Sequence, residues 1–215
     1  PPIPPEGRVF VAGAAIAAFG LFWLSPVAGT IGVFLTLGVA AFFRDPTRVP
    51  PKEEGAVLAT GDGIISGIVH TPAPPEVGLG DAARLRISTF LSLFDVHVNR
   101  IPVGGTVKAI RYSPGKFFNA SLDKASVDNE RNAIHIVTPE GIDVVVVQIA
   151  GLVARRIVCT LKEGQQVRAG DRLGLIRFGS RMDVYLPAGT EALVRVGQVA
   201  NGAETVLARL DRPAV

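Results

Sequence analysis

The stretch VFVAGAAIAAFGLFWLSPVAGTIGVFLTLGVAAFF, from Val9 to Phe43, carries no charged side chain and is interrupted only at Ser25-Pro26. Each of its two runs, Val9–Leu24 and Val27–Phe43, is close to the ~17 residues that a helix needs to cross a membrane. The second run follows the first at once, whereas a signal peptide would be followed by a cleavage site. The stretch predicts a retained helical hairpin anchor over residues 1–43. The alternative is a buried hairpin of a soluble core, because both runs are rich in Gly and Ala.

Basic residues flank this hairpin on both sides. Arg8 precedes it, and Arg44, Arg48 and Lys52 follow it. Positive residues favour the cytoplasmic side of a membrane, so both ends of the hairpin are predicted to be cytoplasmic. The sequence therefore predicts a protein of the cell membrane whose remaining residues lie on the cytoplasmic side.

Residues 44–215 change to short apolar segments separated by Gly, Pro and Asp. This pattern predicts a mainly β domain, an antiparallel sandwich or barrel. Within it, Gly164–Gly174 (GQQVRAGDRLG) has the turn-strand-turn rhythm of a barrel-sandwich hybrid such as a lipoyl domain. The predicted strands are Ala56–Ala59, Gly63–Val69, Ala83–Thr89, Val96–Val98, Gly105–Tyr112, Ala133–Thr138, Ile142–Ile149, Arg156–Leu161, Asp171–Arg177, Val184–Leu186 and Ala192–Val196.

The composition narrows the range of partners. The chain has 215 residues, a net charge of +3 and 7% aromatic residues, without a dense basic block. This balance argues against nucleic acid and favours an anionic lipid surface. The single cysteine, Cys159, excludes an intramolecular disulfide and reads as a buried strand residue. No two histidines have metal-ligand spacing, so no metal site is predicted.

A Gly-Ser bond near the carboxyl end is a candidate for self-cleavage. Gly179 permits the unusual backbone dihedrals of an N-to-O acyl shift, in which the Ser180 hydroxyl attacks the Gly179 carbonyl. Elimination and hydrolysis of the ester would leave Ser180 as a pyruvoyl group, an electrophile that can form a Schiff base with an amine. The alternative is an ordinary turn between the strand-like segments Leu173–Ile176 and Val184–Leu186.

Three histidines compete as proton carriers. His70 precedes a Pro-rich loop and is expected to be solvated, and His135 lies opposite Ile134 and Ile136, on a sheet face that could be wet. His97 shares a predicted strand face with Asp95 and Asn99, because side chains alternate along a strand. That polar stripe is either solvent-facing or part of a cleft. His97 is the proton shuttle predicted here, because its unperturbed pKa lies near working pH.

Several motifs in one order resemble the short form of the phosphatidylserine decarboxylase family, which consists of pyruvoyl-dependent, self-processing membrane enzymes. The resemblance covers nearly the whole chain, and its motifs are Phe42-Phe43-Arg44-Asp45-Pro46, Ala59-Thr60-Gly61-Asp62-Gly63, Phe90 to Arg100 (FLSLFDVHVNR), Tyr112-Ser113-Pro114-Gly115-Lys116-Phe117, Asn129-Glu130-Arg131-Asn132 and Phe178-Gly179-Ser180.

The resemblance implies cleavage between Gly179 and Ser180 into a β chain, residues 1–179, and an α chain, residues 180–215, that begins with the pyruvoyl group. The two chains would form a heterodimer; its further oligomeric state stays open. The resemblance also implies that His97 and Asp62 assist Ser180 in the manner of a Ser-His-Asp relay. Longer relatives carry a second histidine where this chain has Arg100. Either His97 serves both cleavage and catalysis, or Arg100 and Asn99 share the task.

The reaction implied is loss of carbon dioxide from phosphatidylserine to give phosphatidylethanolamine, with His97 as proton donor. Arg44, Arg48, Arg177 and Arg181 are weaker candidates for contacts with the lipid phosphate. Archaetidylserine or another seryl lipid would need the same head-group chemistry, so no residue discriminates between these substrates. A lipoyl-like carrier is a competing hypothesis; its only candidate attachment motif, Asp123-Lys124-Ala125, lies far upstream of Gly164–Gly174.

Overall fold

The structure, a computed structural model, describes residues 2–115, 129–151, 157–176 and 179–211. Two compact units make up the chain, Pro1–Thr47 and Arg48–Val215. The lysine of the Asp123-Lys124-Ala125 motif, Phe178 and Arg177 lie outside the described residues.

The first unit is a pair of helices, α1 (Pro5–Phe22) and α2 (Pro26–Phe42), as predicted. Ser25 caps α2 by accepting a hydrogen bond from the Val27 amide at 3.2 Å, and Pro26 starts the helix without needing an amide partner. The helices approach closely where Gly32 faces Ala18, since an added Cβ would lie 2.9 Å from the Ala18 Cα atom. α1, with 18 residues, is long and apolar enough to cross a membrane, and α2 is an apolar helix of 17 residues.

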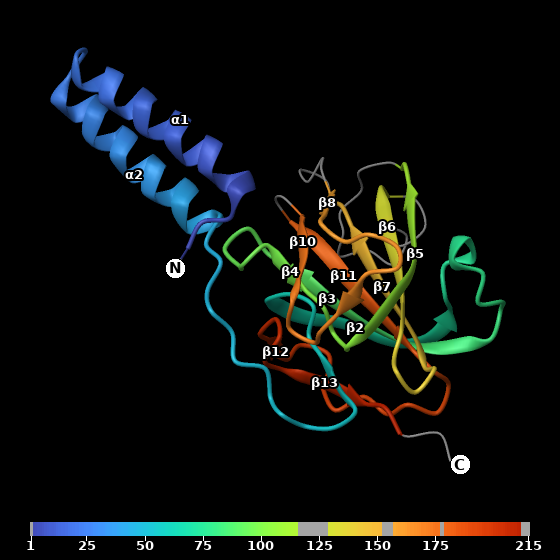
Figure 1. The fold of residues 1–215 in the computed structure, drawn as a ribbon. Helices are drawn as coiled ribbons and strands as arrows, with labels where there is room; N and C mark the ends of the chain where they lie inside the picture. The colour runs from blue at the N-terminus through green and yellow to red at the C-terminus, as the bar shows by residue number, and fades with distance from the viewer. Residues whose placement is uncertain (1, 116–128, 152–156, 177–178, 212–215) are drawn as a thin grey trace. The chain divides into compact units, whose positions relative to one another are not determined.

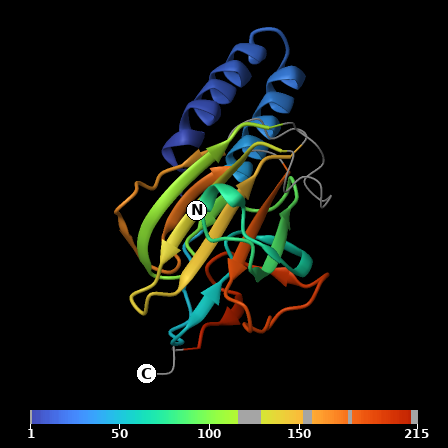
Figure 2. The same cartoon turned by 90° about the vertical axis from the view of Figure 1, so that its right-hand side faces the viewer.

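The second unit is mainly β, which confirms the predicted fold class. An eight-stranded antiparallel sheet has the order β12-β2-β3-β11-β7-β6-β5-β9 and curls into a half-barrel, as Figures 1 and 2 show. Two smaller sheets accompany it, with the orders β4-β10-β8 and β1-β13. The strands are β1 (Ala56–Leu58), β2 (Gly63–Pro72), β3 (Ala83–Leu91), β4 (Val98–Arg100), β5 (Gly105–Ser113), β6 (Arg131–Val137), β7 (Asp143–Ile149), β8 (Ile157–Cys159), β9 (Gln166–Val167), β10 (Arg172–Ile176), β11 (Ser180–Leu186), β12 (Val199–Ala200) and β13 (Val206–Arg209).

Both faces of the large sheet are covered, so its central strands carry apolar residues on both sides. One face contributes Met182, Val184 and Leu186 of β11 to the main core, which also contains Leu173 of β10. On the other face Tyr185 belongs to a smaller cluster. The β2–β3 connection covers that cluster with side chains that include Val77, the last residue of the 3-10 helix η1 (Pro75–Val77).

Most predicted strands are present, and three predictions are wrong. The strand predicted at Val96–Val98 is β4, Val98–Arg100, so His97 lies just before it. Ala192–Val196 is not a strand; Ala192 makes only an isolated bridge to Ala208, and the pairing along the chain's end uses β12 and β13 instead. The strand predicted at Val184–Leu186 begins at Ser180, because β3 pairs with it from Ser180 and β7 pairs with it from Arg181. Ser180 therefore lies in a central strand and not in a turn.

Candidate active site

Ser180 begins β11, the strand between β3 and β7 in the large sheet. Its register partner across the β3 ladder is Leu91. Alternation along β11 puts Ser180 on the same face as Met182, Val184 and Leu186, and its side chain is completely buried. The candidate nucleophile therefore lies at the end of the main core, away from bulk water.

The backbone at Gly179 has a φ of 61°, in the left-handed region that a Cβ atom makes costly. The Ser180 hydroxyl that follows has no hydrogen-bond partner among the described residues. The buried hydroxyls of Thr60 and Ser88 also lack a described partner, so Ser180 is distinguished by its position directly after Gly179. A permissive glycine and an uncommitted hydroxyl are what the acyl shift requires.

His97 lies directly before β4 and is only 3% exposed, which excludes the solvent-facing interpretation of its polar stripe. Its carbonyl oxygen accepts a hydrogen bond from the Ile176 amide at 3.4 Å, at the end of β10. The chain continues from Ile176 to Gly179 through two residues outside the described ranges. The backbone of His97 is therefore hydrogen-bonded to Ile176, which precedes Ser180 by four positions.

A chain of buried amide side chains connects β6, β7 and β4. Asn132 donates to Gln148 Oε1 at 3.1 Å, and Gln148 Nε2 donates to Asn99 Oδ1 at 3.0 Å. The Nδ2 group of Asn99 has no partner among the described residues. Gln148 pairs in register with Met182, next to the Ser180 end of β11. The network fixes the orientation of Asn99 and leaves one amide donor unused.

Gln148 was not predicted as a site residue, although the sequence holds a signal for it. It is the polar residue in the otherwise apolar strand run Val144–Ile149, and a buried polar group needs partners.

Asp62 lies in the loop before β2, and both of its carboxylate oxygens have partners. Arg48 contacts Oδ2 at 2.6 Å, and the Gly202 amide donates to Oδ1 at 2.8 Å. The neighbouring Gly61 packs against Leu91, since an added Cβ would lie 3.0 Å from that side chain. The Asp62 loop is thus next to the register partner of Ser180, while the carboxylate itself binds Arg48 and Gly202. A relay through His97 stays a prediction.

The predicted phosphate contacts Arg48 and Arg181 both form ion pairs, partly buried for Arg48 and buried for Arg181. Arg48 binds Asp62 and also Glu204, at 3.2 Å. Arg181 lies on the opposite face of β11 from Ser180 and pairs with Asp183 at 2.9 Å, with side chains 2% and 0% exposed. The structure thus gives both arginines partners within the domain.

Arg100 and Arg44 each donate a hydrogen bond to a backbone carbonyl. The amide of Arg100 donates to the Thr60 carbonyl at 2.8 Å, which joins β4 to the Asp62 loop. Arg44 donates to the Ala41 carbonyl at 2.8 Å at the end of α2. Arg100 is half-buried and stays a candidate at the site's edge.

The remaining histidines lie elsewhere. His70 is exposed near the end of β2. His135 is buried and lies 2.6 Å from Asp143, so the expectation of a wet sheet face is wrong. Cys159 lies in β8 as predicted, but it is half-buried, and desolvation raises the pKa of its thiol.

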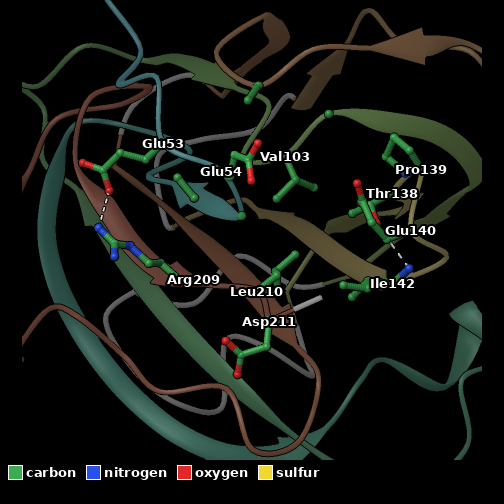
Figure 3. Close-up of a pocket in the computed structure, with 14 residues that line it drawn as sticks. Glu53, Glu54, Val103, Thr138, Pro139, Glu140, Ile142, Arg209, Leu210 and Asp211 are labelled. Carbon is green, nitrogen blue, oxygen red and sulfur yellow. Dashed lines mark hydrogen bonds and ion pairs between the residues drawn. The ribbon is translucent and has the colours of Figure 1, made fainter. Parts of the chain in front are cut away.

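A cleft of about 650 Å³ lies in another part of the second unit (Figure 3). Its rim includes Glu54 and Asp211, and Glu53 forms an ion pair with Arg209 at 2.5 Å. None of the predicted site residues lines it. The buried, uncommitted hydroxyl of Ser180 is the more specific chemical feature, so the candidate site is placed there.

Fold and site together define a mainly β protein with an apolar helical hairpin and a buried Gly-Ser junction at the start of a central strand. Residues 35–208 match the family profile described as phosphatidylserine decarboxylase. The chain belongs to the phosphatidylserine decarboxylase family, as the sequence motifs indicated.

Close relatives share nearly the whole chain. A protein of Cereibacter sphaeroides is 54% identical over 97% of this chain and 90% of its own length. Proteins of Granulibacter bethesdensis and Ruegeria pomeroyi are 56% and 54% identical, over 98% and 97% of this chain and 86% and 95% of their own lengths. All three are named phosphatidylserine decarboxylase proenzyme, which is consistent with self-processing.

Proposed function

We propose that this chain is a proenzyme that cleaves itself between Gly179 and Ser180 and then converts phosphatidylserine to phosphatidylethanolamine and carbon dioxide. The family supports the reaction. The observation that carries the site assignment is the completely buried Ser180 hydroxyl, without a described partner, directly after a glycine at φ 61°.

Self-cleavage needs only groups of this chain and one water molecule. The Ser180 oxygen bonds to the Gly179 carbonyl carbon as the peptide C–N bond breaks, which leaves an ester and a free amine. Elimination then breaks the Cβ–O bond and releases the Gly179 carboxylate. Hydrolysis of the remaining dehydroalanine releases ammonia and leaves the pyruvoyl group. His97 is the proposed base for the hydroxyl proton.

The environment of Ser180 suits such a group. Once formed, the pyruvoyl group supplies a carbonyl that condenses with the substrate amine and accepts the electrons released with carbon dioxide. His97 holds the proton that is returned to the substrate carbon. Asn99 contributes the amide donor that the Gln148 contact leaves free. The buried position excludes water, which strengthens each of these polar interactions.

After cleavage the α chain is proposed to stay bound to the β chain through strand pairing. β11 is hydrogen-bonded to β3 and β7, and β12 and β13 pair with β2 and β1. Every one of these partner strands precedes Gly179. The cut is therefore compatible with an intact sheet and a stable heterodimer of α and β chains.

The hairpin of α1 and α2 is proposed to hold the enzyme at the cell membrane, with the β-rich unit on the cytoplasmic side. The apolar helices, which carry charges only at Glu6 and Arg8 near the start of α1, support the anchor. Arg8, Arg44 and Arg48 support the orientation. Tethering restricts the search for a lipid head group to the membrane surface.

Intact-mass measurement tests this proposal. The wild-type protein is expected to give two fragments, with the smaller running from a blocked residue 180 to Val215. Ser180→Ala is expected to stay one inactive chain, because it lacks both the attacking oxygen and the source of the carbonyl. Cleavage at Gly179 in Ser180→Ala, or a free serine at the start of the wild-type fragment, would refute the mechanism.

A further inference from the structure

Two large apolar side chains lie at the tip of the turn between β3 and β4. Leu93 is 51% exposed and Phe94 is 85% exposed. The apolar residues on either side, Leu91 and Val96, are 0% and 4% exposed. The exposure is therefore confined to the tip and is not a general property of the segment.

Local hydrogen bonds hold this turn. The Ser92 amide donates to Asp95 Oδ2 at 2.7 Å, and the Asp95 amide donates to the Ser92 carbonyl at 3.2 Å. The Asp95 carboxylate is thus turned toward the backbone at the base of the tip. Such a turn keeps Leu93 and Phe94 at its outer end at little further cost in conformational entropy.

The tip also lies beside the candidate active site. Leu91, at the end of β3, is the register partner of Ser180. On the other side of the turn, His97 follows within three residues of Phe94 and is anchored to Ile176. The turn therefore joins the strand that pairs with Ser180 to the segment that carries the proposed proton donor.

We propose that the Leu93-Phe94 tip inserts into the lipid bilayer at the mouth of the active site, as a membrane contact separate from the hairpin. This inference rests on the proposed function, because a phospholipid substrate must present its head group to Ser180 while its acyl chains stay in the bilayer. Apolar side chains beside the site would bring the membrane surface to that point, and a leucine next to an aromatic ring suits the interface. A lipid surface fits these neighbours better than a protein partner does, because the substrate itself comes from it.

Tryptophan fluorescence tests insertion directly. The only tryptophan of the chain is Trp23 in the hairpin, so full-length Trp23→Phe/Phe94→Trp places a single indole at the tip. In vesicles of phosphatidylserine and brominated phosphatidylcholine, this indole is expected to be quenched. Leu193→Trp in the same background is the matched control, since Leu193 is 55% exposed in a different connection, between β11 and β12. An unquenched indole at position 94, or equal quenching at both positions, would overturn the proposal.

Activity measurements separate a membrane contact from a role in the site. Leu93→Ser/Phe94→Ser is expected to mature normally and to lose on the order of tenfold of its activity on vesicles, which corresponds to ~1.4 kcal/mol of lost membrane contact. Its activity on a monomeric short-chain substrate should be unchanged. Leu193→Ser should keep its activity both on vesicles and on the short-chain substrate. An equal loss on both substrates would mean that the turn shapes the site, against the proposal.

The quenching result stands even if the proposed function fails. A wild-type chain that does not cleave would refute self-processing, while the indole at position 94 would still report whether the tip enters the bilayer. If the double serine variant does not fold, the conservative Phe94→Trp substitution decides the question alone.

Discussion

Arg181 and Asp183, two residues apart on one face of β11, form an ion pair that is almost completely withdrawn from water. Their side chains are 2% and 0% exposed, the Arg181 Nε and Asp183 Oδ1 atoms lie 2.9 Å apart, and Arg181 donates a hydrogen bond to Oδ2 at 3.0 Å. Ser180 lies on the other face of the same strand. One strand thus carries a candidate nucleophile on one side and a structural ion pair on the other.

The first prediction is that Arg181 acts in stability. Arg181→Met leaves Asp183 as a buried charge without this partner and should lower the free energy of unfolding by ~3–5 kcal/mol. The double variant Arg181→Met/Asp183→Leu should recover most of that loss, because apolar replacement of a whole buried pair is close to neutral. Both variants are made in a Ser180→Ala background, which is expected to stay uncleaved, and their free energies of unfolding are measured by denaturant titration. Full stability of Arg181→Met would return Arg181 to the candidates for phosphate binding.

The second prediction concerns Tyr185, on the same face of β11. Burial, the largest contribution, and the nearby Asp183 charge raise the pKa of its phenol from 10 to about 12. Between these values the unfolded chain releases a proton that the folded chain keeps, so stability should fall as pH rises from 10 to 12, by ~3 kcal/mol in total. Below pH 10 the phenol is protonated in both the folded and the unfolded chain, so it does not make stability depend on pH. Tyr185→Phe should remove this component of the pH dependence, and identical profiles above pH 10 would contradict it.

The third prediction tests the amide network. Gln148→Leu leaves the Asn132 donor and the Asn99 acceptor unpaired at a cost of about 1–3 kcal/mol each, so maturation should be slow and the precursor less stable. Gln148→Glu is the matched variant, since it still accepts from Asn132 but cannot donate to Asn99. If the orientation of Asn99 is what matters, Gln148→Glu should also mature slowly. If Gln148→Glu forms the two fragments at the wild-type rate, Gln148 contributes to packing and not to maturation through Asn99.

The sequence predicted the hairpin, the β class and most strands, because these follow from local patterns of apolar residues. It failed where pairing partners decide the structure. Ser180 becomes a strand residue because Leu91 of β3 pairs with it. Ala192–Val196 lacks a full ladder partner despite its apolar residues. Neither partner is visible from the local sequence.

For the candidate site, too, the sequence identified some residues but not the contacts that distant residues make with them. Gly179, Ser180 and His97 could be selected from residue type and motif. The contacts of Asp62 with Arg48 and Gly202 could not, because the contacts come from residues 14 and 140 positions away in the chain. Gln148 was missed for the same reason, since its partners lie on β4 and β6.

The fourth prediction concerns the hairpin. A chain that begins at Arg44 should lose most of its membrane association, keeping at most the contact proposed for Leu93 and Phe94. It should still cleave at Gly179, because every candidate for the chemistry lies in the second unit. Its activity should fall more on bilayers than on a dispersed short-chain substrate. Sedimentation with vesicles and intact mass measure the two effects separately. Undiminished sedimentation would show that the hairpin is not the main anchor.

The last prediction tests His97, the proposed base and proton donor. His97→Ala removes the imidazole and should slow self-cleavage by ~10²- to 10⁴-fold, the usual contribution of a general base. The fraction that does mature should decarboxylate poorly, because the same group is proposed to return the proton to the substrate carbon. Fragment appearance and carbon dioxide release must be timed separately. Arg100→Ala is the comparison variant, since Arg100 lies three positions after His97 at the edge of the site. Normal rates of both steps in His97→Ala, with a loss in Arg100→Ala, would transfer the proton-carrying role from His97 to the neighbourhood of Arg100.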